Sequence, residues 1–232
     1  MTKRPLRTAI CVTAVALFAA CGKGGSYGGT PAQTGSAQGI TFTTNFAGIE
    51  SPISENGAWH HTGLDWTRVA KASGFAHGTQ TGNGSYDDSY AYLSGFPANQ
   101  SASATIVLNT SVNDSNTREA ELLLRWSDAD HSATGYEINL HYLGAYVQIV
   151  RWNGLFGMFT ELLSVTPPTP KTGDVFKATI VGNVITVFYN GAQIAQVADP
   201  TYATGNPGMG FFIRAPAANT DFGFSSFTAT GL

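Results

Sequence analysis

Arg118–Trp152 reads REAELLLRWSDADHSATGYEINLHYLGAYVQIVRW, and this stretch decides the fold. It divides into three segments in which apolar and polar residues alternate. Successive residues of a β-strand point to opposite sides of a sheet, so each segment offers one apolar side to a core and one polar side outward. The residues expected to point inward are Ala120, Leu122, Leu124, Trp126, Tyr136, Ile138, Leu140, Ala145, Val147 and Ile149.

The outward-pointing residues of these segments form the candidate binding surface. Side by side, the three strands place carboxylates, amides, a guanidinium, an imidazole and aromatic rings on one face. Carboxylates and amides hydrogen-bond to sugar hydroxyls, and aromatic rings stack on the apolar C–H faces of sugar rings. We therefore expect a glycan-binding face made of Glu119, Glu121, Arg125, Glu137, Asn139, His141, Tyr146, Gln148 and Trp152. Tyr142 is predicted either to stack on sugar or to lie in the core.

The composition favours a single all-β domain. The chain has 232 residues, of which 43% are hydrophobic and 12% are charged, and it contains 27 glycines. That length is enough for one sizeable core, and short alternating segments recur from Ile40 onward without a helical period. About twelve strands are expected, which predicts two packed antiparallel sheets, a β-sandwich of the jelly-roll type. Hairpin turns are predicted at Asn153-Gly154, Gly182-Asn183 and Asn190-Gly191.

The first 21 residues have the pattern of an export signal. Lys3, Arg4 and Arg7 precede an apolar run over residues 8–20 that is too short to span a bilayer as a mature helix. Small residues before Cys21 resemble a bacterial lipobox, in which the cysteine is lipidated and becomes the new N-terminus. An ordinary secretory signal cut just before this cysteine is the alternative. The segment therefore predicts export from a bacterial cell, with the protein lipid-anchored to the outer membrane or cell surface, or else secreted.

The remaining chain divides into a tether and one domain. Residues 22–39 are rich in Gly, Ser and Thr and predict a flexible tether, and residues 40–232 are expected to form the sandwich. Cys11 and Cys21 both precede the domain, which therefore has no disulfide. Without the signal, the chain has nine Lys and Arg residues and fifteen Asp and Glu residues, which gives a net charge of −6. A polysaccharide or oligosaccharide is the expected partner, nucleic acid is not, and membrane contact is expected only through the anchor.

Several stretches of the sequence resemble a known superfamily. GDVFKATIVGNVITVFYNGAQIAQVAD (Gly173–Asp199), TGNPGMGFF (Thr204–Phe212) and DFGFSSF (Asp221–Phe227) resemble the C-terminal half of concanavalin A-like lectin/glucanase domains, especially laminin-G-like bacterial modules. GYEINLHYLGAYVQIVRWNG (Gly135–Gly154) is similar to their central strands. The resemblance covers roughly residues 40–231 and implies a jelly roll. Lectins, glycosidases, polysaccharide lyases and adhesive modules share this fold, so the resemblance alone names no activity.

Two enzymatic readings follow from the resemblance. Jelly-roll glucanases carry an E-x-D-x-E pattern on one strand, and here Glu119 and Glu121 match its first two positions while Leu123 replaces the third carboxylate. Hydrolysis by that mechanism is therefore not expected. Alginate-lyase-type enzymes imply a different set, with His141 as base, Tyr146 as acid, and Arg125 with Gln148 or Asn139 neutralising a uronate carboxylate.

Carbohydrate binding is the preferred hypothesis, without a confident catalytic residue. A uronate-polymer lyase is the alternative, preferred over a glycoside hydrolase, and an adhesive protein-binding module is the third reading. No cofactor is expected to be required, although superfamily resemblance leaves a structural calcium ion open. The candidate ligands, all in loops or turns with hard oxygen donors, are Asp87, Asp88, Asp128, Asp130 and Asp221.

Overall fold

A computed structural model of the chain describes residues 39–72, 74–109, 117–215 and 217–232, which belong to one compact unit, Gln38–Leu232. The export signal, the lipidation of Cys21 and nearly all of the predicted tether lie outside the described residues. Within the described residues, no helix is long and apolar enough to cross a membrane. The regular helical structure described is one 3₁₀ turn, Asn219–Asp221.

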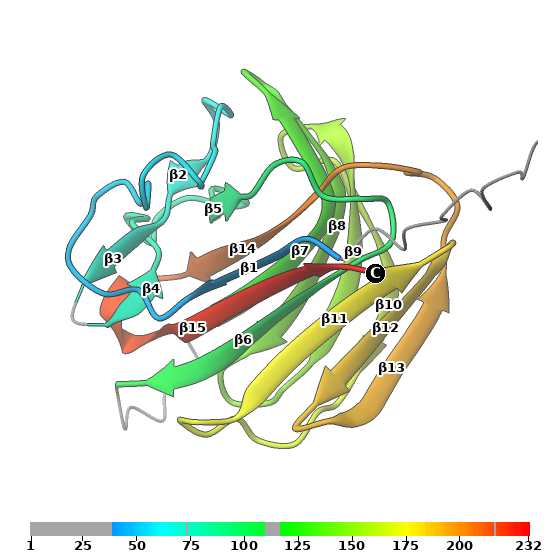
Figure 1. Cartoon of the computed structure of the whole chain (residues 1–232). Coiled ribbons are helices and arrows are strands. Elements are labelled where there is room, and N and C mark those ends of the chain that lie inside the picture. The colour runs from blue at the N-terminus through cyan, green and yellow to red at the C-terminus, as the bar shows by residue number, and fades with distance from the viewer. Residues whose placement is uncertain (1–38, 73, 110–116, 216) are drawn as a thin grey trace, which may run out of the picture. The chain divides into compact units, whose positions relative to one another are not determined.

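Two curved sheets pack face to face, as Figure 1 shows. The seven-stranded sheet has the order β10 (Phe159–Val165), β9 (Val147–Leu155), β8 (Ser132–His141), β7 (Arg118–Ala129), β14 (Asn206–Ile213), β5 (Ser89–Tyr92) and β2 (Thr67–Arg68). The eight-stranded sheet has the order β13 (Ala192–Ala198), β12 (Val184–Tyr189), β11 (Val175–Val181), β6 (Gln100–Leu108), β15 (Phe222–Gly231), β4 (Phe75–His77) and β3 (Ala70–Ala72), and β1 (Thr41–Thr44) pairs with β15. The all-β two-sheet sandwich is confirmed. One pairing departs from the antiparallel expectation, because β2 runs parallel to β5 over two residues.

The predicted alternation places the core between the sheets. Leu122, Ile138 and Ile149 from the seven-stranded sheet are fully buried in one cluster with Phe176 and Phe227 from the other sheet. Tyr142 belongs to the same cluster and is core rather than a sugar platform. Two of the residues predicted to point inward do not: Ala145 is exposed in the turn before β9, and Trp126 lies on the other side of the sheet.

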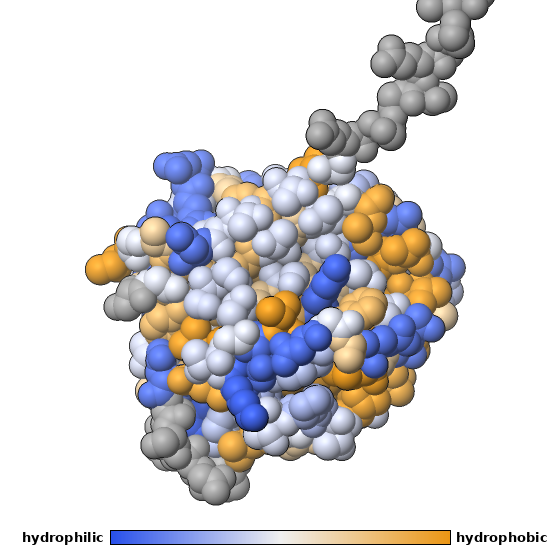
Figure 2. Space-filling view, turned by 60° about the horizontal axis from the view of Figure 1, so that its bottom comes forward, coloured by the Kyte–Doolittle hydropathy of each residue, from blue (hydrophilic) through white to orange (hydrophobic). Residues whose placement is uncertain are grey.

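The surface in Figure 2 is mixed: hydrophobic and hydrophilic residues are interspersed, with more hydrophobic surface toward the right of the view.

A bulge in β7 reverses the alternation beyond Leu124. Arg125 has a φ of 49°, and the register with β8 shifts between Leu124 and Ser127. An extra residue in one strand turns all later side chains to the opposite face. Trp126 is buried, but on the outer side of the seven-stranded sheet instead of between the sheets.

The predicted turns are confirmed except for one. Gly182-Asn183 joins β11 to β12, and Asn190-Gly191 joins β12 to β13. Asn153-Gly154 instead lies within β9, and the chain turns at residues 156–158. There the backbone N–H of Met158 donates to the carbonyl oxygen of Leu155, which closes the hairpin without an Asn-Gly pair.

Candidate functional site

Strand register collects most of the predicted residues on the outer face of the seven-stranded sheet, the face turned away from the eight-stranded sheet. Directly opposed pairs share one face of a sheet. The pairs along β7, β8 and β9 are Glu119 with His141, Glu121 with Asn139, Leu123 with Glu137, Asn139 with Gln148, and Glu137 with Val150. The structure therefore places the predicted side chains of β8, β9 and the first half of β7 on one face of the sheet.

A second hydrophobic cluster covers one end of this outer face. Its buried members are Trp66, Tyr90, Leu123, Trp126, Ala133, Val150 and Trp152. The rings of Trp66 and Trp126 meet that of Trp152 edge-on, at centroid distances of 5.7 and 6.4 Å. This cluster walls off one side of the face, so the polar residues beside it border an apolar surface.

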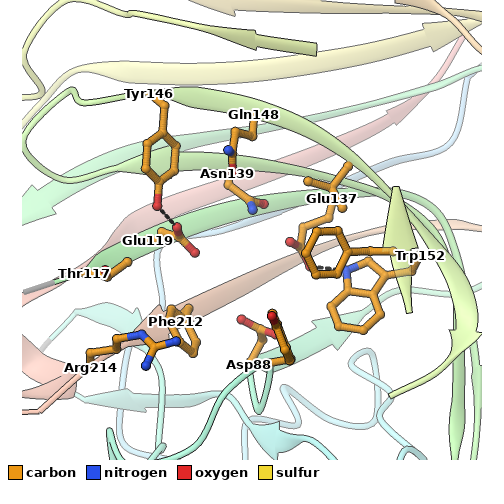
Figure 3. A pocket seen from close by; sticks show the side chains of 13 residues that line it. Asp88, Thr117, Glu119, Glu137, Asn139, Tyr146, Gln148, Trp152, Phe212 and Arg214 are labelled. Carbon is orange, nitrogen blue, oxygen red and sulfur yellow. Dashed lines mark hydrogen bonds between the residues drawn. The ribbon is translucent and has the colours of Figure 1, made fainter. Parts of the chain in front are cut away.

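Beside the cluster lies a pocket of about 220 Å³, shown in Figure 3. Glu119, Glu137 and Asp88 extend toward the same opening, with Tyr146 and Gln148 on one side and Arg214 on the other. The lining consists of Tyr86, Asp88, Thr117, Glu119, Glu137, Asn139, Tyr146, Gln148, Val150, Trp152, Phe159, Phe212 and Arg214. Its volume suits one or two sugar rings rather than a long enclosed ligand.

Hydrogen bonds fix two of the pocket carboxylates. The Tyr146 hydroxyl donates to Glu119 Oε1, and Trp152 Nε1 donates to Glu137 Oε2 at 2.8 Å. Glu121 lies on the same strand face as Glu119 but is fully buried, and neither of its oxygens has a hydrogen-bond partner in the part of the chain that the structure describes. The pocket therefore has two oriented carboxylates at its surface and one unpaired carboxylate among the buried residues of the same face.

Burial raises the pKa of all four carboxyl groups in this region. Desolvation raises the pKa of Glu119 to about 6, against hydrogen bonding from Tyr146 and the charge of Arg214, which lower it. Desolvation, with repulsion from Glu119, raises the pKa of Glu137 to about 7. For Asp88 and Glu121, desolvation and the neighbouring carboxylates raise the pKa well above its usual range. Each carboxylate makes ionisation of the next one costlier.

Arg125 is not part of the candidate site, contrary to the sequence prediction. The bulge turns its side chain to the opposite side of the sheet, where it is 3% exposed. Its guanidinium donates three hydrogen bonds of 2.6 to 2.9 Å to backbone carbonyl oxygens, those of Ala98, Tyr202 and Gly182. Arg125 therefore joins three loops of the sandwich and does not line the pocket.

His141 and Trp152 lie on the expected face but are less accessible than predicted. His141 is buried beside Tyr146, with ring centroids 5.0 Å apart, and its Nδ1 accepts a hydrogen bond from the backbone N–H of Leu143. It is absent from the pocket lining. Trp152 is only 2% exposed and forms wall rather than an open stacking platform.

The exposed aromatic residues at the pocket were missed by sequence reasoning. Tyr86 is 45% exposed and Phe159 is 41% exposed, and their ring centroids lie 5.5 Å apart. Tyr86 comes from the loop before β5, and Phe159 begins β10. Phe212 and Arg214, at the end of β14, were missed as well, because β14 pairs with β7 from a distant part of the chain. No local sequence pattern indicates that β14 lies next to β7.

Three of the proposed loop calcium ligands have other surroundings. Asp128 accepts hydrogen bonds from Thr62, Gly63, Tyr90 and Tyr92, which together fill its carboxylate. Asp221 pairs with Arg118 at 2.9 Å, and Asp130 is exposed. Asp87 lies in the loop before β5, between the pocket-lining residues Tyr86 and Asp88, and does not itself line the pocket. Asp88 groups with Glu119 and Glu121, and one carboxylate oxygen of each lies within 4.8 Å of the others.

The structure is similar to several solved carbohydrate-related proteins. The carbohydrate-binding module CBM66 from Bacillus subtilis has a TM-score of 0.52 at 15% identity, covering 77% of this chain and 95% of that one. The VIP36 exoplasmic/lumenal domain, in a Ca²⁺/Man3GlcNAc-bound form, has a TM-score of 0.55 at 11% identity, with 80% and 90% covered. The kappa-carrageenase from Zobellia galactanivorans has a TM-score of 0.51 at 11% identity, with 85% and 98% covered.

The fold is the concanavalin A-like jelly roll. No protein-family model and no curated protein matches the sequence. The finer resemblance to laminin-G-like bacterial modules stays a prediction. Because the concanavalin A-like fold carries binding and catalytic proteins alike, the activity has to be argued from the pocket.

Proposed function

We propose that this chain is a carbohydrate-binding domain that holds a glycan in the pocket on the outer face of the seven-stranded sheet. The observation that carries the proposal is the combination at one opening of oriented carboxylates and amides with exposed aromatic rings. Glu119, Asn139 and Gln148 supply acceptors and donors for sugar hydroxyls, and Tyr86 and Phe159 supply apolar ring faces. The solved neighbours support it, since a carbohydrate-binding module and a Man3GlcNAc-bound domain share the fold.

The charge of the pocket argues for neutral sugars. Asp88, Glu119 and Glu137 line it, and Arg214 is the single cationic side chain among the described lining residues. At neutral pH and without a bound cation, a uronate carboxylate brought into this opening meets the ionised Glu119, whose pKa is about 6, and this like charge opposes its binding. The lyase alternative also loses Arg125 as its neutralising group. The geometry therefore favours binding of neutral glycans over elimination on a uronate polymer.

A glycan screen tests the proposal. The purified chain is titrated against neutral polysaccharides and oligosaccharides and against uronate polymers, and both binding and ultraviolet absorbance are recorded. In buffer without divalent cations, we expect binding to neutral glycans, weaker or no binding to uronates, and no rise in absorbance from unsaturated products. Capture of a protein partner with no glycan binding would instead favour the adhesive module, and turnover of a uronate polymer would favour the lyase.

Removing the exposed aromatic rings should weaken glycan binding. Phe159→Ala and Tyr86→Ala are each expected to reduce affinity about tenfold, because a stacked ring contributes on the order of 1 kcal/mol. Isothermal titration calorimetry with the best glycan of the screen measures the effect. Phe188→Ala, which removes a half-buried ring from the eight-stranded sheet, is the matched control. Equal affinities for all three variants would contradict the proposed stacking surface.

We also propose that the domain is exported and anchored by a lipid on Cys21. The support is the sequence pattern of residues 1–21 and the Gly-rich segment that follows. Cys21→Ser, expressed in a bacterial host, is expected to abolish incorporation of labelled fatty acid and to shift the protein out of the membrane fraction. Labelling and fractionation that are the same for the variant and the natural sequence would rule out the anchor.

A further inference from the structure

We infer that Asp88, Glu119 and Glu121 form a calcium-binding site at the base of the outer-face pocket. Their ligand oxygens lie within 4.8 Å of one another, and they form the one group of three such residues found in the described part of the chain. Glu119 and Glu121 stand two apart on one face of β7, and Asp88 directly precedes β5, on the other side of β14. Three separate backbone positions thus direct carboxylates to one point.

The burial of Glu121 without a hydrogen-bond partner points to a ligand. Its side chain is fully buried, and both carboxylate oxygens have no partner among the described residues. An ionised carboxylate is buried at large cost unless it is paired or coordinates a metal. None of the ion pairs found within the described residues involves Asp88, Glu119 or Glu121. A bound cation would supply the counter-charge that lets these carboxyl groups ionise together, which burial and mutual repulsion otherwise oppose.

The surrounding chain leaves room for this carboxylate and adds a neutral oxygen. Gly210 of β14 is the residue opposite Glu121, and a Cβ at that position would collide with Glu121 Oε2. Glycine therefore allows the carboxylate to lie against the strand. On the other side, Asn139 is opposite Glu121, and its Oδ1 is also buried without a partner among the described residues. This second orphaned oxygen, on the neighbouring strand, gives a fourth candidate ligand.

The donor set selects a hard divalent cation. All four candidate ligands are carboxylate or amide oxygens, which Ca²⁺ prefers, and no His or Cys belongs to the group, which disfavours zinc. In a calcium shell with bonds of roughly 2.3–2.6 Å, opposite oxygens are about 5 Å apart, which accommodates the observed spacing. Asp88 and Glu119 also line the pocket, so water or a ligand hydroxyl has access to the remaining coordination positions.

Direct ion titration tests the site independently of glycan binding. The purified chain is depleted of metal with a chelator, dialysed, and titrated with CaCl₂ by calorimetry, with thermal unfolding followed in parallel. We expect one calcium ion per chain and a rise of several degrees in Tm. Failure to bind Ca²⁺ at millimolar concentration would overturn the site, and it would leave the proposed glycan pocket standing if the glycan screen is positive.

Variants locate the ion. Glu121→Gln keeps the shape of the side chain and is expected to weaken calcium binding at least tenfold and to remove most of the calcium-induced rise in Tm. Asp88→Asn is expected to have the same effect. It provides the test if near-ultraviolet circular dichroism shows that Glu121→Gln is poorly folded. Asp130→Asn, at an exposed turn, is the matched control and should bind calcium as the natural chain does. Unchanged calcium affinity in a folded Glu121→Gln or Asp88→Asn variant would refute the assignment.

Discussion

Arg125→Ala is expected to destabilise the fold by about 3 kcal/mol while leaving the affinity of the folded protein for glycan unchanged. The guanidinium donates to the carbonyl oxygens of Ala98, Tyr202 and Gly182, and the Arg125 backbone N–H donates to Gln100 Oε1 at 3.0 Å. Alanine keeps the backbone hydrogen bond but leaves three carbonyl groups without their charged donor. Each hydrogen bond to a charged group is worth roughly 1.5–3 kcal/mol, discounted here because the loops are partly exposed.

Urea unfolding measures the loss of stability, and calorimetry measures binding. Arg214→Ala is the matched control, because Arg214 is exposed and lines the pocket. Its removal should change the free energy of unfolding by less than about 0.5 kcal/mol while altering glycan affinity. A stable Arg125→Ala variant that has lost glycan binding would restore Arg125 to the site and contradict the placement described above.

The second large effect is a pH-dependent stability difference between the natural chain and Glu119→Gln, both depleted of calcium. The pKa of Glu119 is raised from 4.5 to about 6 in the folded protein, so the folded state retains a proton that the unfolded state releases. The resulting stabilisation is present below pH 4.5 and is lost as the pH rises through 6. A shift of this size corresponds to on the order of 2 kcal/mol.

Comparing the two proteins removes an opposing contribution from histidine. Burial lowers the pKa of His61 to about 4 and also lowers the pKa of His141. A depressed histidine pKa adds stability as the pH rises toward 6.5, the opposite sign to the carboxyl effect. Both histidines are present in both proteins, so their contributions cancel in the difference. In urea unfolding at pH 4.5, 6 and 7.5, the free energy of unfolding of the natural chain should fall relative to that of the variant as the pH rises. A difference that is independent of pH would show that Glu119 is not held in a desolvated site.

Local sequence pattern predicted the layers and much of the binding face. Alternation placed Leu122, Ile138 and Ile149 in the core, and Glu119, Asn139 and Gln148 on the outer face. Alternation places these residues correctly because each segment is paired along most of its length with its neighbour in sequence, so parity alone fixes the face of each side chain.

The errors arise where the chain departs from regular pairing. The bulge at Arg125 has no sequence signal of its own, since a positive φ is ordinarily carried by glycine. It removed Arg125 from the predicted site and moved Trp126 into the outer cluster. Tyr86, Phe212 and Arg214 were missed for another reason: β5 and β14 reach the site through pairings between distant segments. Glu121 was predicted on the correct face, but its complete burial depends on those same strands.

A crystal structure of the chain with the tightest-binding glycan tests the central claim most directly. We expect a sugar ring in the pocket between Tyr146 and Arg214. One apolar face of the ring should lie against Phe159 or Tyr86, and its hydroxyls should form hydrogen bonds with Glu119, Asn139 or Gln148. A glycan seated on the eight-stranded sheet, or on loops away from this pocket, would contradict it.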